Sequence, residues 1–280
     1  MTIQKWNGAV RGRVLTISAL FLASNFCPSG RGEELYCQVK YTVCAVPNGG
    51  TISGKVSLKG KIPACDRMEI SQDGKVCGRL KSSPRLCVWK DGGVGETIVY
   101  IEGVSKGKSF PSDDVYQLEQ HHCEYNPHLL IVPAGKCLQI VNNDQVLHNV
   151  HAYQTAEESK TVFNIAQPIK GVKSKTRALM DPGLIRVSCD AGHPWMSAHV
   201  MVAEHPYYTI TDKNGNYSLC DVPPGEYTIR LWHEGVAIAN RSMEHGKVKN
   251  YEFEPPYEES RRVTVTAKTT STADFQLSLR

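Results

Sequence analysis

Residues 184–203 read LIRVSCDAGHPWMSAHVMVA, two short apolar runs on either side of a loop that carries unusual side chains. The flanking runs, Leu184–Ser188 and His199–Ala203, have the length and residue types of β-strands. The loop between them, Cys189–Met196, holds a thiol, an imidazole and a thioether within eight residues. This stretch therefore predicts two strands joined by a turn that presents soft donor atoms.

Similar runs recur along the chain after residue 47, separated by turn residues such as Asn214-Gly215. No stretch shows a sustained period of 3.6 residues, and the best helical candidate is a short piece within residues 154–180. Short strands with regular turn signals predict an all-β protein built from sandwiches or barrels. The other runs are Thr51–Leu58, Thr97–Ile101, Leu129–Val132, Leu138–Val141, Tyr217–Leu219, Tyr227–Trp232 and Val263–Ala267.

The composition excludes several classes of protein. The chain has 280 residues, of which 41% are hydrophobic and 21% charged, which fits one large or two modest folded domains and excludes disorder. The formal charge of +4 is too small to indicate a basic surface for binding nucleic acid. No apolar run reaches the roughly 18 residues that cross a bilayer, so we do not expect an integral membrane protein.

Ten cysteines and the first 25 residues both favour export. The cysteines are scattered without a Cys-x-x-Cys pair, which favours disulfides in an oxidising compartment over zinc. Arg11 and Arg13 precede the apolar stretch Val14–Ala23, as in a signal peptide, although no clean cleavage site follows. We therefore expect residues 1–25 to be a signal peptide, residues 26–48 an N-terminal segment, and the protein to be periplasmic or extracellular. The alternative for the first residues is a buried strand.

Another candidate metal ligand, His148, lies about 40 residues upstream of the loop. His148 follows the strand Leu138–Val141 and a polar turn. Two imidazoles, a thiolate and a weak axial thioether make the ligand set of blue-copper electron-transfer sites. The sequence predicts one copper ion per chain bound by His148, Cys189, His193 and Met196. The alternative is that Cys189 is half of a structural disulfide.

These motifs resemble the cupredoxins, the class of plastocyanin and azurin. The resemblance is carried by His148-Asn149 and by the Cys-x3-His-x2-Met spacing of Cys189–Met196. Tyr125–His128, Val132–Gly135 and Phe163-Asn164 are similar to plastocyanin-like proteins exported by bacteria. The resemblance implies that residues 113–204 form a Greek-key β-sandwich. It also implies a type 1 copper protein that carries single electrons between redox protein partners and is not an enzyme.

A second resemblance covers the sequence on either side of that region. Thr51–Leu58 and Thr97–Ile101 are similar to the opening strands of the carboxypeptidase-regulatory-like (transthyretin-like) sandwich. Thr211–Leu219 and Val222–Ile229 look like its closing hairpin, with Asn214-Gly215 as the tight turn. The resemblance implies that residues 49–112 and 205–280 form one sandwich, with the copper domain inserted in it or beside it. Two tandem sandwiches are the alternative.

Neighbouring side chains have competing interpretations. Strand alternation points His151 away from His148, so it is not expected to be a ligand. Asn149 either links the ligand loops by hydrogen bonds or is a plain turn residue. Trp195 is either an exposed docking aromatic or a core side chain. His199 could replace Met196 as a ligand.

The remaining histidines and cysteines are expected to be structural. His121-His122 with Cys123 and His128 could form a second metal site, but a solvated pair is the favoured interpretation. Cys77 and Cys123 are the first choice for a disulfide, because both flank the proposed inserted domain.

No nucleophile–base–acid arrangement is visible, so catalysis has little support. The rival functions are a metal-free extracellular binding module, copper storage or delivery, and a copper enzyme such as a reductase.

Overall fold

The computed structural model describes residues 41–112, 115–157 and 160–278. The expected signal peptide, residues 1–25, and most of the N-terminal segment lie outside the described residues. Strands dominate, as the alternating runs predicted, and the all-β fold class is confirmed. Within the described residues, the one α-helix is the short α1 (Gly74–Cys77). No helix in the described part of the chain is long and apolar enough to cross a membrane.

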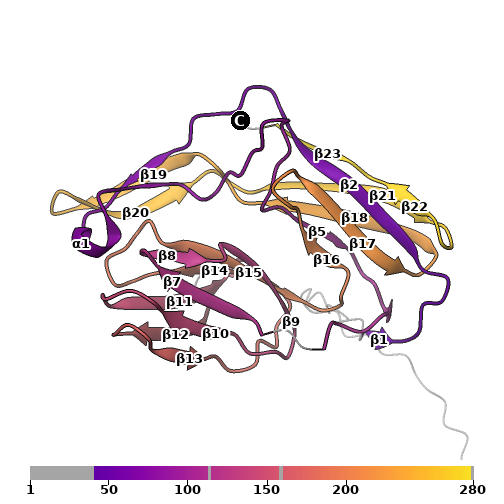
Figure 1. The fold of residues 1–280 in the computed structure, drawn as a ribbon, viewed down its shortest axis with the longest axis horizontal. Helices are drawn as coiled ribbons and strands as arrows, with labels where there is room; N and C mark the ends of the chain where they lie inside the picture. The colour runs from indigo at the N-terminus through magenta and orange to yellow at the C-terminus, as the bar shows by residue number, and fades with distance from the viewer. Residues whose placement is uncertain (1–40, 113–114, 158–159, 279–280) are drawn as a thin grey trace, which may run out of the picture. The chain divides into compact units, whose positions relative to one another are not determined.

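Residues 117–203 form a sandwich of two sheets, which we call the first sandwich (Figure 1). Its strands alternate buried and exposed positions, so that Leu118, Ile140, Val150 and Val187 fill the space between the sheets. One sheet has the order β13 (Lys173–Lys175), β10 (Gln139–Asn142), β7 (Gln117–His121), β8 (Glu124–Asn126). The other has the order β12 (Thr161–Gln167), β11 (His148–Gln154), β14 (Gly183–Ser188), β15 (Ser197–Ala203), β9 (Leu129–Pro133).

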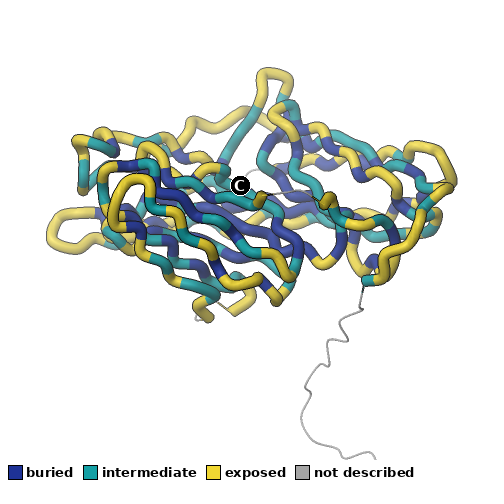
Figure 2. Tube along the Cα trace, turned by 60° about the horizontal axis from the view of Figure 1, so that its bottom comes forward, coloured by how far each residue is buried: buried dark blue, intermediate teal, exposed yellow. Residues whose placement is uncertain are grey.

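A second sandwich is built from chain on both sides of the first. Its core contains Ile52, Val56, Ile229 and Phe275. Figure 2 shows the buried segments of the chain in dark blue, with exposed segments in yellow at many of the bends around them. One sheet has the order β16 (Tyr208–Ile210), β5 (Ile98–Ile101), β18 (Gly225–His233), β21 (Tyr257–Val265). The other contains β17 (Asn216–Val222), β2 (Gly50–Lys59), β22 (Thr270–Thr272) and β23 (Phe275–Ser278). Because β2 and β5 precede the first sandwich and the other strands follow it, the first sandwich is an insertion in the sequence of the second.

Two smaller pieces contact the first sandwich; we call them the arm and the β19–β20 hairpin. The arm contains β3 (Arg67–Glu69), α1 and β4 (Leu80–Ser82). The hairpin is β19 (Ile238–Glu244) with β20 (Lys247–Phe253). Met68 of the arm and Tyr251 of the hairpin are buried in the core cluster of the first sandwich. A short parallel pair, β1 (Thr42–Val43) with β6 (Lys106–Gly107), completes the strands.

Two local predictions were wrong. The described residues of 154–180 hold no helix; they contain β12 and β13, because Thr161–Gln167 pair with β11. The turn at Asn214-Gly215 forms, with Gly215 at φ +80, but it does not close a hairpin. Instead β16 pairs with β5, and β17 pairs with β2, so this turn carries the chain from one sheet to the other.

Candidate metal centre

The ligand loop, Cys189–Met196, joins the end of β14 to the start of β15. His148 is the first residue of β11, and β11 pairs with β14 so that His151 lies opposite Ser188. This register brings the start of β11 beside the first residue of the loop. The arrangement is the one that the strand ends predicted: a histidine from a neighbouring strand facing donors from one turn.

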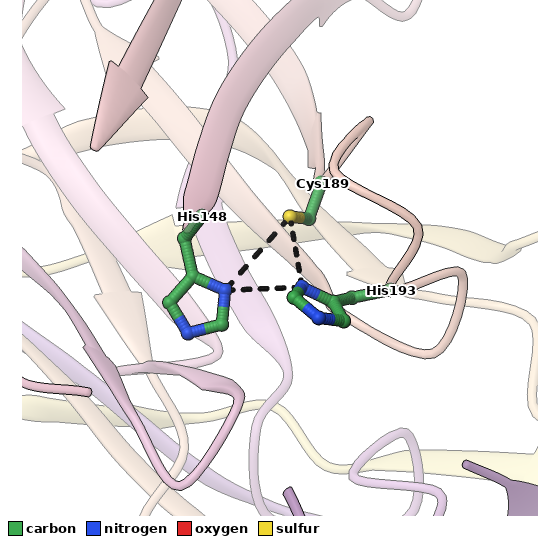
Figure 3. Close-up of side chains that lie close together, drawn as sticks. All are labelled: His148, Cys189 and His193. Atoms are coloured by element: carbon green, nitrogen blue, oxygen red, sulfur yellow. Dashed lines mark hydrogen bonds between the residues drawn. The ribbon is translucent and has the colours of Figure 1, made fainter. Parts of the chain in front are cut away.

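Three donor atoms converge at this point (Figure 3). The Nδ1 atoms of His148 and His193 lie 3.1 Å apart, and the Sγ of Cys189 is 3.5 Å from the second and 4.0 Å from the first. The two imidazoles are fully buried and Cys189 is 6% exposed. A point equidistant from the three atoms is about 2.1 Å from each, which is close to metal–imidazole and metal–thiolate bond lengths. The triangle therefore has the size that one metal ion requires.

Each histidine is held from behind by a carboxylate. Nε2 of His148 lies 2.9 Å from Oδ2 of Asp144, and Nε2 of His193 lies 2.9 Å from Oδ2 of Asp73. A carboxylate accepts, so Nε2 carries the proton in both rings and the Nδ1 lone pairs are left facing each other. Two lone pairs 3.1 Å apart in a dry interior repel unless a cation lies between them. The donor set and its protonation thus fit a metal ion.

Burial and hydrogen bonds shift the pKa values of Asp144 and His193 in opposite directions. Burial raises the pKa of Asp144, but hydrogen bonds from His148 and from the backbone of Cys123 and His122 outweigh it and lower that pKa to about 2. Burial lowers the pKa of His193, and the hydrogen bond to Asp73 opposes that shift. Asp144 is therefore ionised across the neutral range, and His193 is held neutral, the form that ligates metals.

Cys189 forms no disulfide with any described cysteine. Burial raises the pKa of its thiol, while hydrogen bonds from the backbone of Asn149 and Ala191 lower it. The Asn149 N–H points at the sulfur at 3.3 Å. The Asn149 side chain also accepts from the Asp190 N–H at 3.3 Å, which confirms that Asn149 links the two ligand segments. Burial has the larger effect, so the pKa of the thiol is raised overall, and a metal that binds the sulfur would displace its proton.

Met196, the fourth predicted ligand, lies in the same turn. It is 2% exposed, belongs to the same core cluster, and its N–H donates to the carbonyl of His193 at 3.0 Å. With Cys189 and His193 it lines a cavity of about 720 Å³. Its role as an axial ligand stays a prediction.

The structure decides the competing interpretations of the other side chains. His151 lies outside the triangle and contacts Asp190 and Thr161, as strand alternation predicted. Of the two alternatives for Trp195, the structure shows the core side chain: it is 3% exposed and its indole donates to the carbonyl of Cys123.

His199 does not replace Met196. It lies instead with His128 beside Glu234, in a buried group that the sequence pattern did not predict. The Cys77–Cys123 disulfide is confirmed, which removes Cys123 from any second metal site with the exposed pair His121-His122.

Both carboxylates behind the histidines were missed from the sequence. Asp144 had a local signal, because an acidic residue in the turn four positions before His148 is within reach of the ring. Asp73 had none, because it comes from the arm, 120 residues before His193.

Comparisons with known proteins find one family match and several weak structural similarities. The model of the carboxypeptidase regulatory-like domain family matches residues 185–278, about a third of the chain. No protein of curated function matches the sequence. At the fold level, a purple cupredoxin from Nitrosopumilus maritimus is 22% identical, with a TM-score of 0.27 and coverage of 31% of this chain and 99% of that one.

Two further solved structures are similar at the same level. Amicyanin from Paracoccus versutus is 19% identical, with a TM-score of 0.27 and coverage of 33% of this chain and 85% of that one. The copper-containing nitrite reductase from Thermus scotoductus is 16% identical, with a TM-score of 0.27 and coverage of 33% of this chain and 23% of that one. Likenesses this weak do not assign a function, so the case for a metal depends on the side chains themselves.

Proposed function

We propose that this protein binds one copper ion through His148, Cys189 and His193, with Met196 as a weak axial ligand, and carries single electrons between redox proteins. One observation carries the proposal: two imidazole Nδ1 atoms and a cysteine sulfur converge within 4.0 Å of one another in a buried site. In both rings the proton is on Nε2, where it is donated to a carboxylate. No proton therefore lies between the two Nδ1 lone pairs.

The donor set favours copper over other metals. Thiolate and thioether are soft ligands and imidazole is borderline, a combination that suits both oxidation states of copper. Bound copper would supply one-electron chemistry by alternating between those two states. Structural zinc sites prefer four strong donors, whereas the described side chains supply three strong donors and a thioether.

The chain's own residues would keep the site rigid during electron transfer. Asp144 and Asp73 fix the tautomer and orientation of the two rings. The Asn149 N–H stabilises the negative sulfur. Burial of all three donors excludes water that would otherwise rearrange when the charge of the site changes. A site held in this way favours electron transfer over bond chemistry, so we propose a carrier and not an enzyme.

We also propose that the protein acts outside the cytoplasm. The Cys77–Cys123 disulfide suits an oxidising compartment. The residues expected to direct export precede the described part of the chain. The periplasm or the extracellular space would also supply the redox protein partners.

The proposal is tested by loading the purified protein with Cu(II) and recording its visible spectrum and electron paramagnetic resonance. We expect one copper per chain, an intense thiolate-to-copper band, and loss of that band in Cys189→Ser. The matched control is Cys137→Ser, which changes a thiol outside the site.

The other outcomes assign the rival functions. A colourless protein with stoichiometric copper would indicate storage or delivery. Absence of copper would indicate a metal-free module. A wide copper hyperfine splitting would indicate an open site such as that of a reductase.

A further inference from the structure

The side chain of Asp73 does not cap the helix that follows it. It is the N-cap residue of α1, where an aspartate ordinarily accepts hydrogen bonds from its own helix, yet its carboxylate makes no capping bond. Its backbone has φ 53, a left-handed conformation that Asp tolerates better than most residues other than glycine. Its Oδ2 instead accepts from Nε2 of His193 at 2.9 Å and from Gln72 at 3.3 Å.

The arm is fastened to the ligand loop at more than one point. The Gln72 amide donates to the carbonyl of Ala191 at 2.9 Å, one residue from Gly192. Gly192 has φ +87, a backbone conformation that favours glycine, and a Cβ there would lie 2.4 Å from Oε1 of Gln72. Gln72 therefore packs closely on the ligand loop beside the Asp73–His193 hydrogen bond.

A covalent bond and the β19–β20 hairpin hold the arm in place. The Cys77–Cys123 disulfide ties α1 to the turn between β7 and β8. The Glu69 N–H donates to the Tyr251 hydroxyl of the hairpin at 3.1 Å. In Figure 1, α1 and β20 lie on the β8 side of the first sandwich.

The same disulfide connects the arm to the other histidine. The N–H groups of His122 and Cys123 each donate to the Asp144 carboxylate at 2.7 Å, and Asp144 holds His148. Asp73 and Asp144, one behind each ring, are thus linked through Cys77 and Cys123. With Asp73 over it, His193 is 0% exposed.

We propose that Asp73 is a positioning residue of the metal centre, resting on the copper function proposed above. It fixes the Nε2–H tautomer of His193, covers the edge of that ring, and places a negative charge behind it that stabilises the more highly charged state of the metal. Its effect on the metal is exerted through His193.

The experiment compares Asp73→Asn and Asp73→Glu in the full-length copper-loaded protein by redox titration at fixed neutral pH. Asn keeps an acceptor but loses the charge, so we expect the oxidised–reduced equilibrium to shift about tenfold toward the reduced state, ~59 mV upward for one electron. Glu keeps the charge and should restore most of the wild-type potential. Glu69→Gln removes a charge from an exposed position on the same arm and should leave the potential unchanged.

A metal-free measurement separates this inference from the copper function. Long-range ¹H–¹⁵N correlation spectra of the apoprotein should show His193 with its proton on Nε2, and a mixture of tautomers in Asp73→Ala. An unchanged potential in Asp73→Asn, or an unchanged tautomer in Asp73→Ala, would overturn the role of Asp73. A wild-type protein that takes up no copper would overturn the proposed function alone, and the tautomer result would still decide the role of Asp73.

Discussion

Arg85 and Glu234 form an ion pair at 2.5 Å with side chains that are 8% and 7% exposed. Arg85 precedes β5 and Glu234 follows β18, so both come from the sequence that flanks the inserted sandwich. The carboxylate also contacts His128, which precedes β9 of the inserted sandwich. The pair is therefore part of a buried charge network that joins residues of the two sandwiches.

Removal of Arg85 should be costly, because it leaves the buried Glu234 carboxylate without one of its charged partners. We expect Arg85→Met to lower the free energy of unfolding by about 3–5 kcal/mol, measured by urea denaturation. Arg230→Met, which breaks an exposed pair with Glu102, should cost less than about 1 kcal/mol. Equal effects of the two substitutions would show that the buried network does not stabilise the fold.

Acidification from pH 7 to pH 5 should destabilise the apoprotein through the buried ring of His199. Burial lowers the pKa of His199 to about 3, with Glu234 opposing that shift and Arg85, His128 and Arg186 adding to it. Below pH 6.5 the unfolded chain binds a proton at this ring and the folded chain does not, so stability falls as the pH drops. Between pH 7 and 5 the loss from this one group is about 2 kcal/mol.

Urea denaturation of the apoprotein at pH 7 and pH 5 measures that loss. His199→Gln should show a smaller fall than the wild type, whereas His245→Gln, at an exposed position, should match the wild type. An equal fall in His199→Gln would contradict the assignment.

The Cys77–Cys123 disulfide closes a loop with a sequence separation of 46. The double substitution Cys77→Ala/Cys123→Ala should lower the free energy of unfolding by about 4 kcal/mol on the chain-entropy model. Cys44→Ala, at an exposed free thiol, is the control. A loss below about 1 kcal/mol would show that the bridge does little to restrain the unfolded chain.

Asp144 should control metal affinity through His148. Asp144→Ala removes the acceptor of the Nε2 proton, so we expect the copper dissociation constant to rise about 10–100-fold, measured by competition with a chelator. Asp181→Ala is the matched control, because that exposed carboxylate pairs with Lys160 and contacts none of the donor residues. Equal losses in both variants would mean that Asp144 does not act through the ligand.

Local pattern was enough to predict the strands and the ligand loop. Two short apolar runs predicted β14 and β15, and the ends of these strands place Cys189 and His193 in the loop between them. The pattern failed wherever the outcome depended on a distant segment. Trp195 was ambiguous because only the packed turn at Cys123 decides that it is buried.

The same limit applies to the contacts that join distant segments. Asp73 could not be predicted, because the disulfide and the arm that bring it to His193 are tertiary features. The buried group of His128, His199 and Glu234 likewise needs both sandwiches to exist. The turn at Asn214-Gly215 was identified, but which sheet each flanking strand joins depends on β2 and β5.

The copper site itself is tested most directly by X-ray absorption at the copper edge of the loaded protein. We expect one short copper–sulfur path from Cys189 and two copper–nitrogen paths from His148 and His193, with the short sulfur path absent in Cys189→Ser. A wild-type spectrum with only nitrogen and oxygen neighbours would rule out copper binding by Cys189.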